Sequence, residues 1–400
     1  MSGKPGLAIL FRYGAGEHLH FLPALPELME DLSRDFTVHH IGFRGEERVP
    51  ESLRRHARLH ELPLRVRRKS EPDKRWKALC WSLLLPWLGL ILRLKKVQVV
   101  FIDETLPLSA FALRLAYRGI IVQTVHDFFL EIYFPPGSRG HRLGTWLQQV
   151  DLRTWKRIQG IFTRVEATRD YLITQGLRPE RIHVAHDPCD LQLFAPRERA
   201  AARAAWGFSP EDVVMVHHGV MHPNKGNDRI LRALARLRHD LPRLKFLLIG
   251  EGPASEALDD LILELGLSGQ VRRTGWLGSM QEVAHALNAA DIGLVMRVGQ
   301  PGDHFHVTST LVHNLATGLP VLAARLDGIQ EIVTEDREAL LFDPVCDAEF
   351  DQKLRRLTED PALRLRLGCA ARATAEDKFD RNHIAASMAD ALRQCGKPAS

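Results

Sequence analysis

The sequence predicts an α/β protein made of two doubly wound domains. Short runs of β-branched and other apolar residues alternate with segments of helical periodicity over most of the 400 residues. The runs are apolar at consecutive positions, which is typical of parallel strands covered by helices on both faces. The alternation occurs twice and breaks near residues 194–197. Each half is therefore expected to form its own parallel sheet with right-handed crossovers.

In the first half, six apolar runs are predicted strands. They occupy residues 7–11, 36–43, 97–103, 119–125, 161–165 and 182–185. The turn Gly14-Ala15-Gly16 follows the first run, and residues 22–32 have the spacing of a helix.

The second half repeats this rhythm with predicted strands at residues 213–216, 245–250, 271–274, 292–296 and 319–323. We expect an N-terminal domain over 1–196, a C-terminal domain over 197–375, and a helix over 376–400 that packs back on the N-terminal domain. In such a fold the cleft between the domains is the default ligand site.

Composition excludes several classes of protein. With 45% apolar and 26% charged residues, the chain has the composition of a soluble globular protein. Its five cysteines form no CxxC pair, which argues against a zinc ribbon or a disulfide framework and favours a reducing cytoplasm. The N-terminus has no apolar signal-peptide core.

Residues 54–92 combine a basic window with an apolar stretch. Residues 54–77 contain ten Lys or Arg and three Asp or Glu, against a net charge of +5 for the whole chain. The next stretch, 79–92, has 14 mostly apolar residues, which is shorter than the roughly 20 of a spanning helix. We expect a buried helix there, with an interfacial segment as the alternative. Together the two parts suggest peripheral contact with an anionic membrane, or else a solvated basic face. No nucleic-acid-binding motif accompanies them.

Three segments carry the pattern of an anion site. Thr308, Ser309 and Thr310 are N-cap candidates for a helix that Gly318 ends, and that N-terminus follows a predicted strand. Backbone N–H groups and the dipole of such a helix favour a diphosphate, although a plainly capped helix has the same sequence. The loop at 217–226, with Gly219 and Lys225, and the turn Gly250-Glu251-Gly252-Pro253 should open at the same edge of the sheet.

Other nucleotide and metal motifs are weak. The chain has no GxxxxGK[ST] loop and no GxGxxG after its first strand. Asp303-His304-Phe305-His306 has residues that bind metals, but a solvated or substrate-contacting loop is the favoured interpretation. We expect no metal site and no cofactor.

Taken together, these segments resemble the GT-B glycosyltransferases, most closely glycosyltransferase family 4. The matching segments are HHGVMHPNKG, KFLLIGEGP, VRRTGWLG, NAADIGLVMR, NLATGLPVLAARLDGIQEIV and ALLFDP in the second half, and VQTVHDFF and ERIHVAHDPCDLQLFAP in the first. The resemblance implies two Rossmann-like domains with an interdomain cleft. It covers about residues 7–380 and is strongest over 213–344.

The resemblance also assigns residues to a site. It places His126, with Asp127 beside it, near the reacting centre, although His126 capping its own turn is the structural alternative. Gly14 and Gly16 match a flexible loop near the acceptor and the donor phosphate, and Trp276 matches a segment near the base. Glu331 matches a position near the donor sugar, or else is a favourable charge at a helix N-terminus. The donor-binding residues expected in this way are Gly14, Gly16, Gly219, Lys225, Gly250, Glu251, Trp276, Ser309, Thr310, His313 and Glu331.

The chain departs from the family pattern at three positions. Val220 stands where an arginine is common, and Phe305 and His313 stand where many members have two glutamates. We expect His313 to form a hydrogen bond to a ribose or sugar hydroxyl.

The resemblance implies transfer of a sugar from a nucleotide diphosphate sugar to a hydroxyl of a glycan, glycolipid or other glycoconjugate, with retention of anomeric configuration. We expect a cytoplasmic, membrane-associated enzyme. Val220 and His313 leave open a degenerate protein that binds nucleotide sugar without turnover. A sugar-nucleotide epimerase on the same fold is a further alternative, for which no paired acid and base can be assembled from the sequence.

Overall fold

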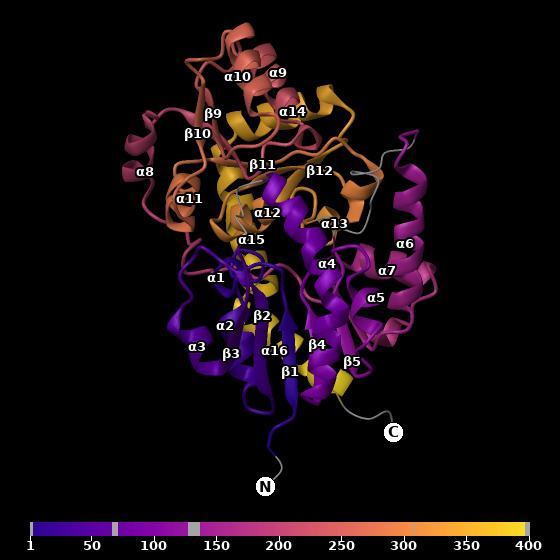
Figure 1. The fold of residues 1–400 in the computed structure, drawn as a ribbon. Coiled ribbons are helices and arrows are strands. Elements are labelled where there is room, and N and C mark those ends of the chain that lie inside the picture. The colour runs from indigo at the N-terminus through magenta and orange to yellow at the C-terminus, as the bar shows by residue number, and fades with distance from the viewer. Residues whose placement is uncertain (1–2, 66–70, 127–136, 306, 397–400) are drawn as a thin grey trace. The chain divides into compact units, whose positions relative to one another are not determined.

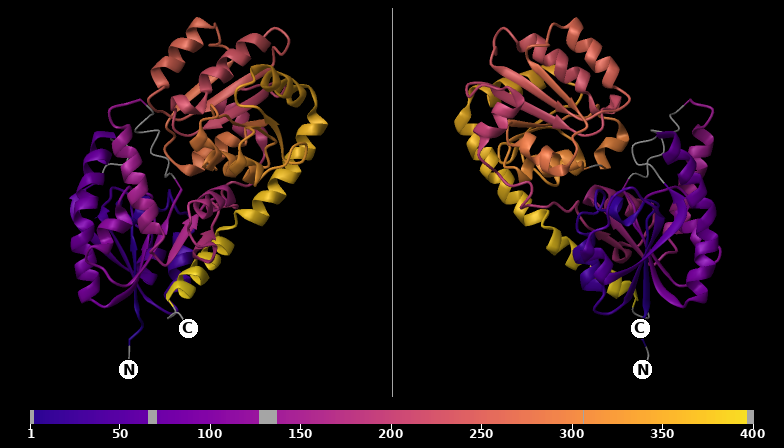
Figure 2. Two further views of the ribbon diagram at one scale, coloured as in Figure 1. Left: turned by 90° about the vertical axis from the view of Figure 1, so that its right-hand side faces the viewer. Right: turned by 60° about the vertical axis from the view of Figure 1, so that its left-hand side comes forward.

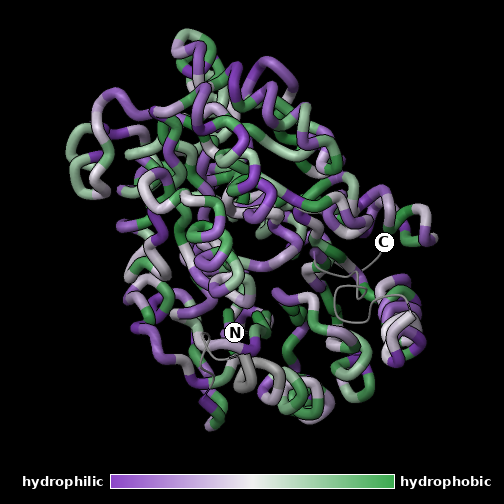
Figure 3. The backbone as a smooth tube through the Cα atoms, turned by 90° about the horizontal axis from the view of Figure 1, so that it is seen from above, coloured by the Kyte–Doolittle hydropathy of each residue, from purple (hydrophilic) through white to green (hydrophobic). Residues whose placement is uncertain are grey.

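The computed structural model of the chain describes residues 3–65, 71–126, 137–305 and 307–396, with the backbone alone described for 71–75. It divides into two compact units (Figure 1). Unit 1 consists of Met1–Pro188 and Arg381–Ser400, and unit 2 consists of Cys189–Asp380. Apolar stretches alternate with polar ones along the helices of both units (Figure 3), as amphipathic helices packed on a sheet require.

Unit 1 contains a parallel sheet of seven strands in the order β3-β2-β1-β4-β5-β6-β7. The strands are β1 Gly6–Leu10, β2 Thr37–Arg44, β3 Ala57–Arg65, β4 Val97–Ile102, β5 Ile120–Thr124, β6 Gly160–Thr163 and β7 Ile182–Val184. Six of them were predicted from their apolar runs. Strand β3 was not predicted because it is an exposed edge strand rich in polar residues, so no apolar run marks it.

Helices cover both faces of this sheet, and each face has its own apolar core. One core receives side chains from α4 Glu71–Leu94, α5 Ser109–Arg114, α6 His141–Trp155 and α7 Glu166–Thr174. The other receives side chains from α1 Ala15–His18, α2 Leu25–Leu32, α3 Glu51–His56 and α16 Arg381–Gly396. Figure 2 shows α4 and α16 on opposite faces of the sheet. A short 3-10 turn, Pro179–Arg181, leads into β7.

The expectation of a buried helix at 79–92 is only half right. The stretch belongs to α4, which has 24 residues and continues through Pro86. One side of α4 is buried through Trp81, Leu85, Leu88 and Leu92, whereas six large apolar residues on the other side are exposed. By length and composition, Trp76–Leu94 is the one helical segment in the described residues that is long and apolar enough to cross a membrane.

Unit 2 contains a parallel sheet of six strands in the order β10-β9-β8-β11-β12-β13. The strands are β8 Val213–His218, β9 Leu244–Ile249, β10 Val271–Gly275, β11 Ile292–Val295, β12 Val321–Ala324 and β13 Ala339–Phe342. The helices are α8 Arg199–Trp206, α9 Asn227–Leu237, α10 Ser255–Glu264, α11 Met280–Leu287, α12 Ser309–Ala316, α13 Asp327–Gln330, α14 Asp347–Glu359 and α15 Pro361–Lys378, with 3-10 turns at Pro223–Lys225 and Pro301–Phe305. Strands β8 to β12 match the five predicted strands, and β13 was not predicted.

The unit boundaries differ from the expected domain limits of 196 and 375. The chain enters unit 2 at Cys189 and leaves it after Asp380, and these two residues form a parallel β-bridge. The Cys189 N–H also donates to the Phe379 carbonyl over 2.8 Å. The crossing segments therefore pair with each other inside unit 2, a long-range contact that local sequence patterns do not show. The C-terminal helix α16 packs on α2 within unit 1.

Candidate functional site

The loops at the carboxyl edge of the unit 2 sheet are held together by backbone hydrogen bonds. The Gly219 N–H donates to the Ile249 carbonyl over 3.0 Å, and the Gly250 N–H donates to the Gly275 carbonyl over 2.8 Å. Gly219 and Gly250 have φ angles of +124° and +120°, a region that favours glycine. A Cβ atom at Gly250 would lie 2.0 Å from the Gly219 carbonyl oxygen. The positive φ angle accounts for Gly219, and the positive φ angle together with the close approach of the two loops accounts for Gly250.

Helix α12 begins at the same edge. Its first residue is Ser309, which is exposed, and Thr310 in the first turn is buried. The Thr310 hydroxyl donates to the His218 carbonyl over 2.8 Å, so the first turn of α12 is fixed to the end of β8. The first N–H groups of a helix have no partner in a preceding turn, and the helix dipole places partial positive charge there. The start of α12 is therefore able to bind an anion.

Three rings stack beside this helix start. The His313 imidazole lies 3.9 Å from the Phe194 ring, centroid to centroid, and 5.1 Å from the His218 imidazole. Both imidazoles are at least nine-tenths buried. Burial, together with the neighbouring His218, holds the pKa of His313 well below its usual value. Burial and the Lys225 charge lower the pKa of His218 to about 4. Both rings are therefore neutral at pH 7.

Several buried polar atoms here have no hydrogen-bond partner within the described part of the chain. They include His218 Nε2, His313 Nδ1 and Thr308 Oγ1, together with His217 Nε2, Asn227 Oδ1, Asn314 Nδ2 and Asn314 Oδ1. A buried polar atom without a partner costs roughly 1–3 kcal/mol. Such a concentration next to a helix N-terminus indicates a place where a ligand or water supplies the missing hydrogen bonds.

Positive charge surrounds the cluster. Lys225 ends the 3-10 turn after β8, and its charge lowers the pKa values of both His217 and His218. Arg297 follows β11 and also lowers the pKa of His217. Burial, together with the charges of Lys225 and Arg297, brings that pKa to about 3. Arg297 pairs with the buried Asp303 over 3.3 Å. Because Asp303 balances the charge of Arg297, the electropositive character of this edge comes from Lys225 and the start of α12.

The segment 303–306 is not arranged as a metal site in the described residues. Asp303 is occupied by Arg297 and by the Gln300 N–H, and His304 lies 3.3 Å from Asp327. His306 lies outside the described residues. Among those that are described, no group of three His, Cys, Asp or Glu side chains is placed to hold a metal ion.

The remaining predicted residues of unit 2 have different surroundings. Glu251 is paired with Arg273 over 3.1 Å and supports the turn after β9. Trp276 follows β10 with half of its surface exposed. Glu331 is the C-cap residue of α13. The alternative interpretation of Glu331, as a charge at a helix N-terminus, is therefore wrong.

In unit 1, His126 comes directly after β5 at the carboxyl edge of the sheet. Its backbone N–H donates to Thr105 Oγ1 over 2.9 Å, and the Thr105 hydroxyl donates to the Thr124 carbonyl over 3.0 Å. The His126 side chain is half-buried, and its Nδ1 lies 3.4 Å from Thr105 Oγ1. Asp127, the other predicted catalytic residue, lies outside the described residues.

Gly14 and Gly16 lie in a tightly packed loop of unit 1. A Cβ atom at Gly14 would lie 2.7 Å from the Gly45 backbone nitrogen, and one at Gly16 would lie 2.8 Å from the Glu47 carbonyl oxygen. The Glu17 carboxylate accepts the backbone N–H groups of Glu46 and Glu47. Contact with the loop after β2 therefore accounts for both glycines.

A buried polar network at the same edge was missed by the sequence analysis. His18 Nε2 lies 2.8 Å from Asp103 Oδ2, and His18 Nδ1 lies 3.1 Å from His40 Nε2. The Thr124 hydroxyl donates to Asp103 Oδ1 over 2.6 Å. These hydrogen bonds and the His18 charge outweigh burial and lower the pKa of Asp103 to about 2. The one signal in the sequence was a polar residue at the end of an apolar run.

Glu104, the next residue, has the opposite behaviour. Its side chain is buried beside the core, and burial raises its pKa to about 7. The Arg12 guanidinium, 3.5 Å away, and the Trp81 indole oppose this rise in part.

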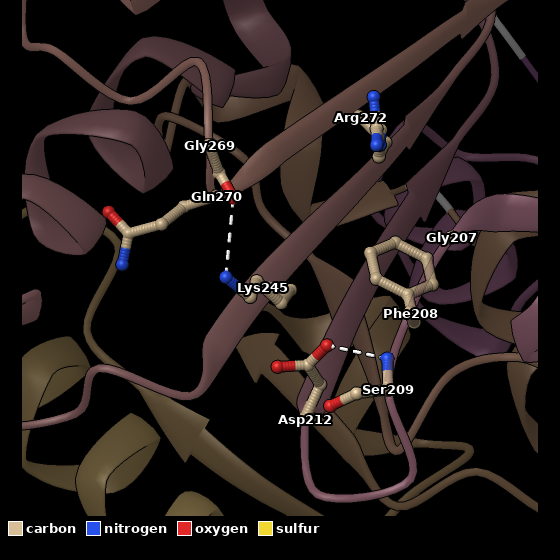
Figure 4. Close-up of a pocket in the computed structure, with 8 residues that line it drawn as sticks. All are labelled: Gly207, Phe208, Ser209, Asp212, Lys245, Gly269, Gln270 and Arg272. Atoms are coloured by element: carbon tan, nitrogen blue, oxygen red, sulfur yellow. Dashed lines mark hydrogen bonds between the residues drawn. The ribbon is translucent and has the colours of Figure 1, made fainter.

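A small pocket of about 160 Å³ lies at the other edge of the unit 2 sheet (Figure 4). It is lined by Gly207, Phe208, Ser209, Asp212, Lys245, Gly269, Gln270 and Arg272. Lys245 and Arg272 stand at the amino ends of β9 and β10, and Lys245 Nζ donates to the Gly269 carbonyl. Ligands of doubly wound sheets bind at the carboxyl ends, so this pocket is separate from the candidate site.

The two sheets, with a helix N-terminus and glycine loops at one carboxyl edge, define the GT-B class of two Rossmann-like units. Residues 198–374 match the family model of glycosyl transferases group 1, and residues 27–193 match that of glycosyltransferase family 4. The two matches together cover most of the chain, which therefore belongs to the GT-B glycosyltransferases of group 1 and family 4.

Individual proteins agree with this assignment. The chain is 32% identical over 230 residues to a D-inositol 3-phosphate glycosyltransferase of Nocardioides, covering 54% of this chain and 49% of the relative. It is 29% identical over 206 residues to the lipopolysaccharide core biosynthesis glycosyltransferase LpsD of Rhizobium meliloti, covering 50% and 57%. The chain thus spans about half the length of these curated relatives. HepE of Anabaena, solved with UDP-glucose, has the same fold, with a TM-score of 0.71 and 18% identity over 97% of this chain and 99% of that one.

Proposed function

We propose that this protein is a glycosyltransferase that moves a sugar from a nucleotide diphosphate sugar to a hydroxyl acceptor. The observation that carries the proposal is that three features lie at one sheet edge: the α12 N-terminus, Lys225, and two buried imidazole nitrogens, His218 Nε2 and His313 Nδ1, which have no hydrogen-bond partner in the described part of the chain. The first two features suit a diphosphate and the third suits the hydroxyls of a sugar or ribose. The UDP-glucose in HepE supports a nucleotide sugar as the class of ligand.

The chemistry follows from the charges. The leaving nucleoside diphosphate gains negative charge as the glycosidic bond breaks. Lys225 and the first turn of α12 stabilise that charge without having to reorganise. Ser309, exposed at the start of α12, adds a hydroxyl donor. These groups supply the charge stabilisation that a divalent cation provides in other enzymes, and we propose that turnover needs no metal ion.

The neutral imidazoles have a different task. Because the pKa values of His218 and His313 are lowered, each ring has one nitrogen that accepts a hydrogen bond at pH 7. A sugar or ribose hydroxyl is the complementary donor. Trp276, with half of its surface exposed after β10, offers a flat apolar face for the base.

The acceptor is assigned to unit 1. His126 and Gly14 both lie after strands of that sheet, at its carboxyl edge. We assign His126 to the reacting centre and a glycan, glycolipid or other glycoconjugate as the acceptor. The name of the Rhizobium relative, a lipopolysaccharide core enzyme, supports a lipid-linked glycan. We further propose retention of anomeric configuration, and a cytoplasmic location at an anionic membrane.

A thermal-shift titration tests the donor class. Uridine, guanosine, adenosine and thymidine diphosphate sugars are added to the full chain in turn. We expect at least one of them to raise the melting temperature. At concentrations well above its Kd, the rise should grow with the logarithm of the nucleotide-sugar concentration. The rise should persist in EDTA and should be smaller for Lys225→Ala than for Lys245→Ala, a lysine at the opposite sheet edge. If no nucleotide sugar shifts the wild-type melting curve, the proposed function is wrong.

A further inference from the structure

Helix α4 has an exposed apolar stripe that its own fold does not use. The stripe consists of Trp76, Leu79, Leu83, Trp87, Leu90 and Leu94, with exposed fractions from 37% to 72%. At about 100° per residue these six side chains fall within an arc of about 80°. The buried residues of α4 lie on the opposite side of the helix. The stripe is about 27 Å long at 1.5 Å per residue.

Two neighbouring helices extend this surface. Helix α5 packs against α4, and α6 packs against α5. All three bury one side in the same core, so their outer sides face away from the same face of the sheet. On those outer sides, Phe111 of α5 and Leu115, its C-cap residue, are exposed, as are Leu143 and Trp146 of α6. Ten large apolar side chains therefore share this face of unit 1, and an apolar surface of this extent indicates a binding partner.

Among the side chains that the structure describes in Trp76–Leu115 and in α6, the exposed charged ones are basic. From Trp76 to Leu115 the acidic residues are Asp103 and Glu104, and both are buried. Asp151, the acidic residue of α6, is also buried. The exposed basic residues are Arg93, Lys95 and Lys96 at the end of α4, and Arg142 and Arg153 of α6. The first turn of α4 adds Glu71, Asp73, Lys74 and Arg75, which cancel in net charge.

These features distinguish a lipid surface from other partners. A second copy of the chain across a twofold axis would bury the same patch of both subunits, so two surfaces of net positive charge would face each other, which is unfavourable. An anionic bilayer complements both parts of the surface, because its headgroups attract the cations and its interface accepts Trp and Leu side chains. A spanning orientation is excluded because it would remove Trp81, Leu85 and Leu88 from the core of unit 1.

We propose that the outer face of α4, α5 and α6 is an interfacial docking surface for an anionic lipid bilayer, with α4 lying in the plane of the membrane. The surface differs from the expected 54–92 patch in extending to α6. Arg54 and Arg55 belong to α3, whose Leu53 is buried in the core on the other face of the sheet. The inference rests on the proposed function, because an enzyme with a lipid-linked acceptor has to reach its substrate at a membrane.

Vesicle co-sedimentation of the full chain tests this surface. The lipids are phosphatidylcholine alone and phosphatidylcholine with phosphatidylglycerol, each at low and high salt. We expect binding to the anionic vesicles at low salt and weaker binding at high salt. The double variant Leu83→Glu/Trp87→Glu should reduce the partition coefficient by about tenfold or more. The matched control Leu263→Glu/Leu365→Glu, which alters two exposed leucines of unit 2, should bind like wild type.

Two further measurements separate the possible failures. Melting curves show that each variant is folded, and nucleotide-sugar thermal shifts should be equal in wild type and the stripe variant. Vesicle binding without any nucleotide response would overturn the proposed function and leave the docking surface standing. The docking surface is wrong if wild type does not bind anionic vesicles at low salt, or if the stripe variant binds as well as wild type. It is also wrong if the stripe variant instead dissociates a dimer of wild type in gel filtration.

Discussion

The His313 imidazole lies flat against the Phe194 ring, with 8° between the ring planes and 3.9 Å between the centroids. Phe194 belongs to the segment that follows the entry of the chain into unit 2, and His313 belongs to α12. The stack therefore fixes the orientation of His313 within α12 and leaves its Nδ1 buried without a partner in the described residues. In the proposed function, this fixed orientation would let the imidazole accept a hydrogen bond from a ligand hydroxyl without rearranging.

Replacing His313 should weaken donor binding. We expect His313→Ala to raise the Kd of the best nucleotide sugar by roughly tenfold, since one such hydrogen bond contributes about 1 kcal/mol or slightly more. His313→Gln, which keeps an acceptor, should recover part of the affinity. Isothermal titration measures both, with His285→Ala, an exposed histidine of α11, as the control. Equal affinities for wild type and His313→Ala would remove His313 from the site.

Lys225 should act mainly on the diphosphate. We expect Lys225→Ala to lower kcat/KM by roughly tenfold to a hundredfold, because a charge that stabilises the leaving group is lost. Lys245→Ala, at the opposite sheet edge, should leave kcat/KM unchanged. Steady-state kinetics with the donor identified by thermal shift provides the comparison. An unchanged kcat/KM in Lys225→Ala would contradict the assignment.

His126 should affect turnover more than donor affinity. A group at the reacting centre contributes typically about 100-fold or more to the rate, so His126→Ala should lower kcat by about that factor with little change in donor Kd. Single-turnover rates and titration calorimetry on the same preparation separate the two effects. If kcat remains at the wild-type value, His126 does not act at the reacting centre.

Gly250→Ala should destabilise unit 2. The residue has a φ angle of +120°, and a Cβ atom would lie 2.0 Å from a carbonyl oxygen of the neighbouring loop. We expect a loss of about 2 kcal/mol or more in the free energy of unfolding. Gly269→Ala, where a Cβ atom meets nothing within 4 Å, is the control. Urea unfolding followed by circular dichroism would show whether the two variants differ.

Glu104 should make stability depend on pH. Its pKa is about 7 in the folded chain and has an ordinary value of 4.5. Because the folded-state pKa is raised, Glu104 favours folding below pH 4.5, and this contribution is lost as the pH rises to about 7. The loss is on the order of 3 kcal/mol.

The variant Glu104→Gln isolates that contribution. Between pH 4.5 and 7, the unfolding free energy of wild type should fall relative to that of Glu104→Gln. Glu211→Gln, at an exposed position, should follow wild type at both pH values. Parallel pH profiles for wild type and Glu104→Gln would show that the carboxyl is not held in its protonated form.

The apolar runs were sufficient to predict most of the sheets. Parallel strands buried on both faces must be apolar at consecutive positions, so β1, β4 and β5 of unit 1 were evident from local sequence. The edge strand β3 lacks that constraint and was not predicted. Gly219, Gly250, Lys225 and Ser309 were also predictable as neighbours, because strand order places their loops at one edge of the unit 2 sheet.

By itself, the sequence determined the two doubly wound units, the loops with Gly219, Gly250 and Lys225, and the helix that begins at Ser309. Local periodicity and turn chemistry encode these features directly. Only the tertiary structure decided which atoms meet: the stack of Phe194 with His313, the His18–Asp103 pair, and the two-sided character of α4. Each depends on residues distant in the chain or on which side of a helix remains uncovered, and that is fixed by packing.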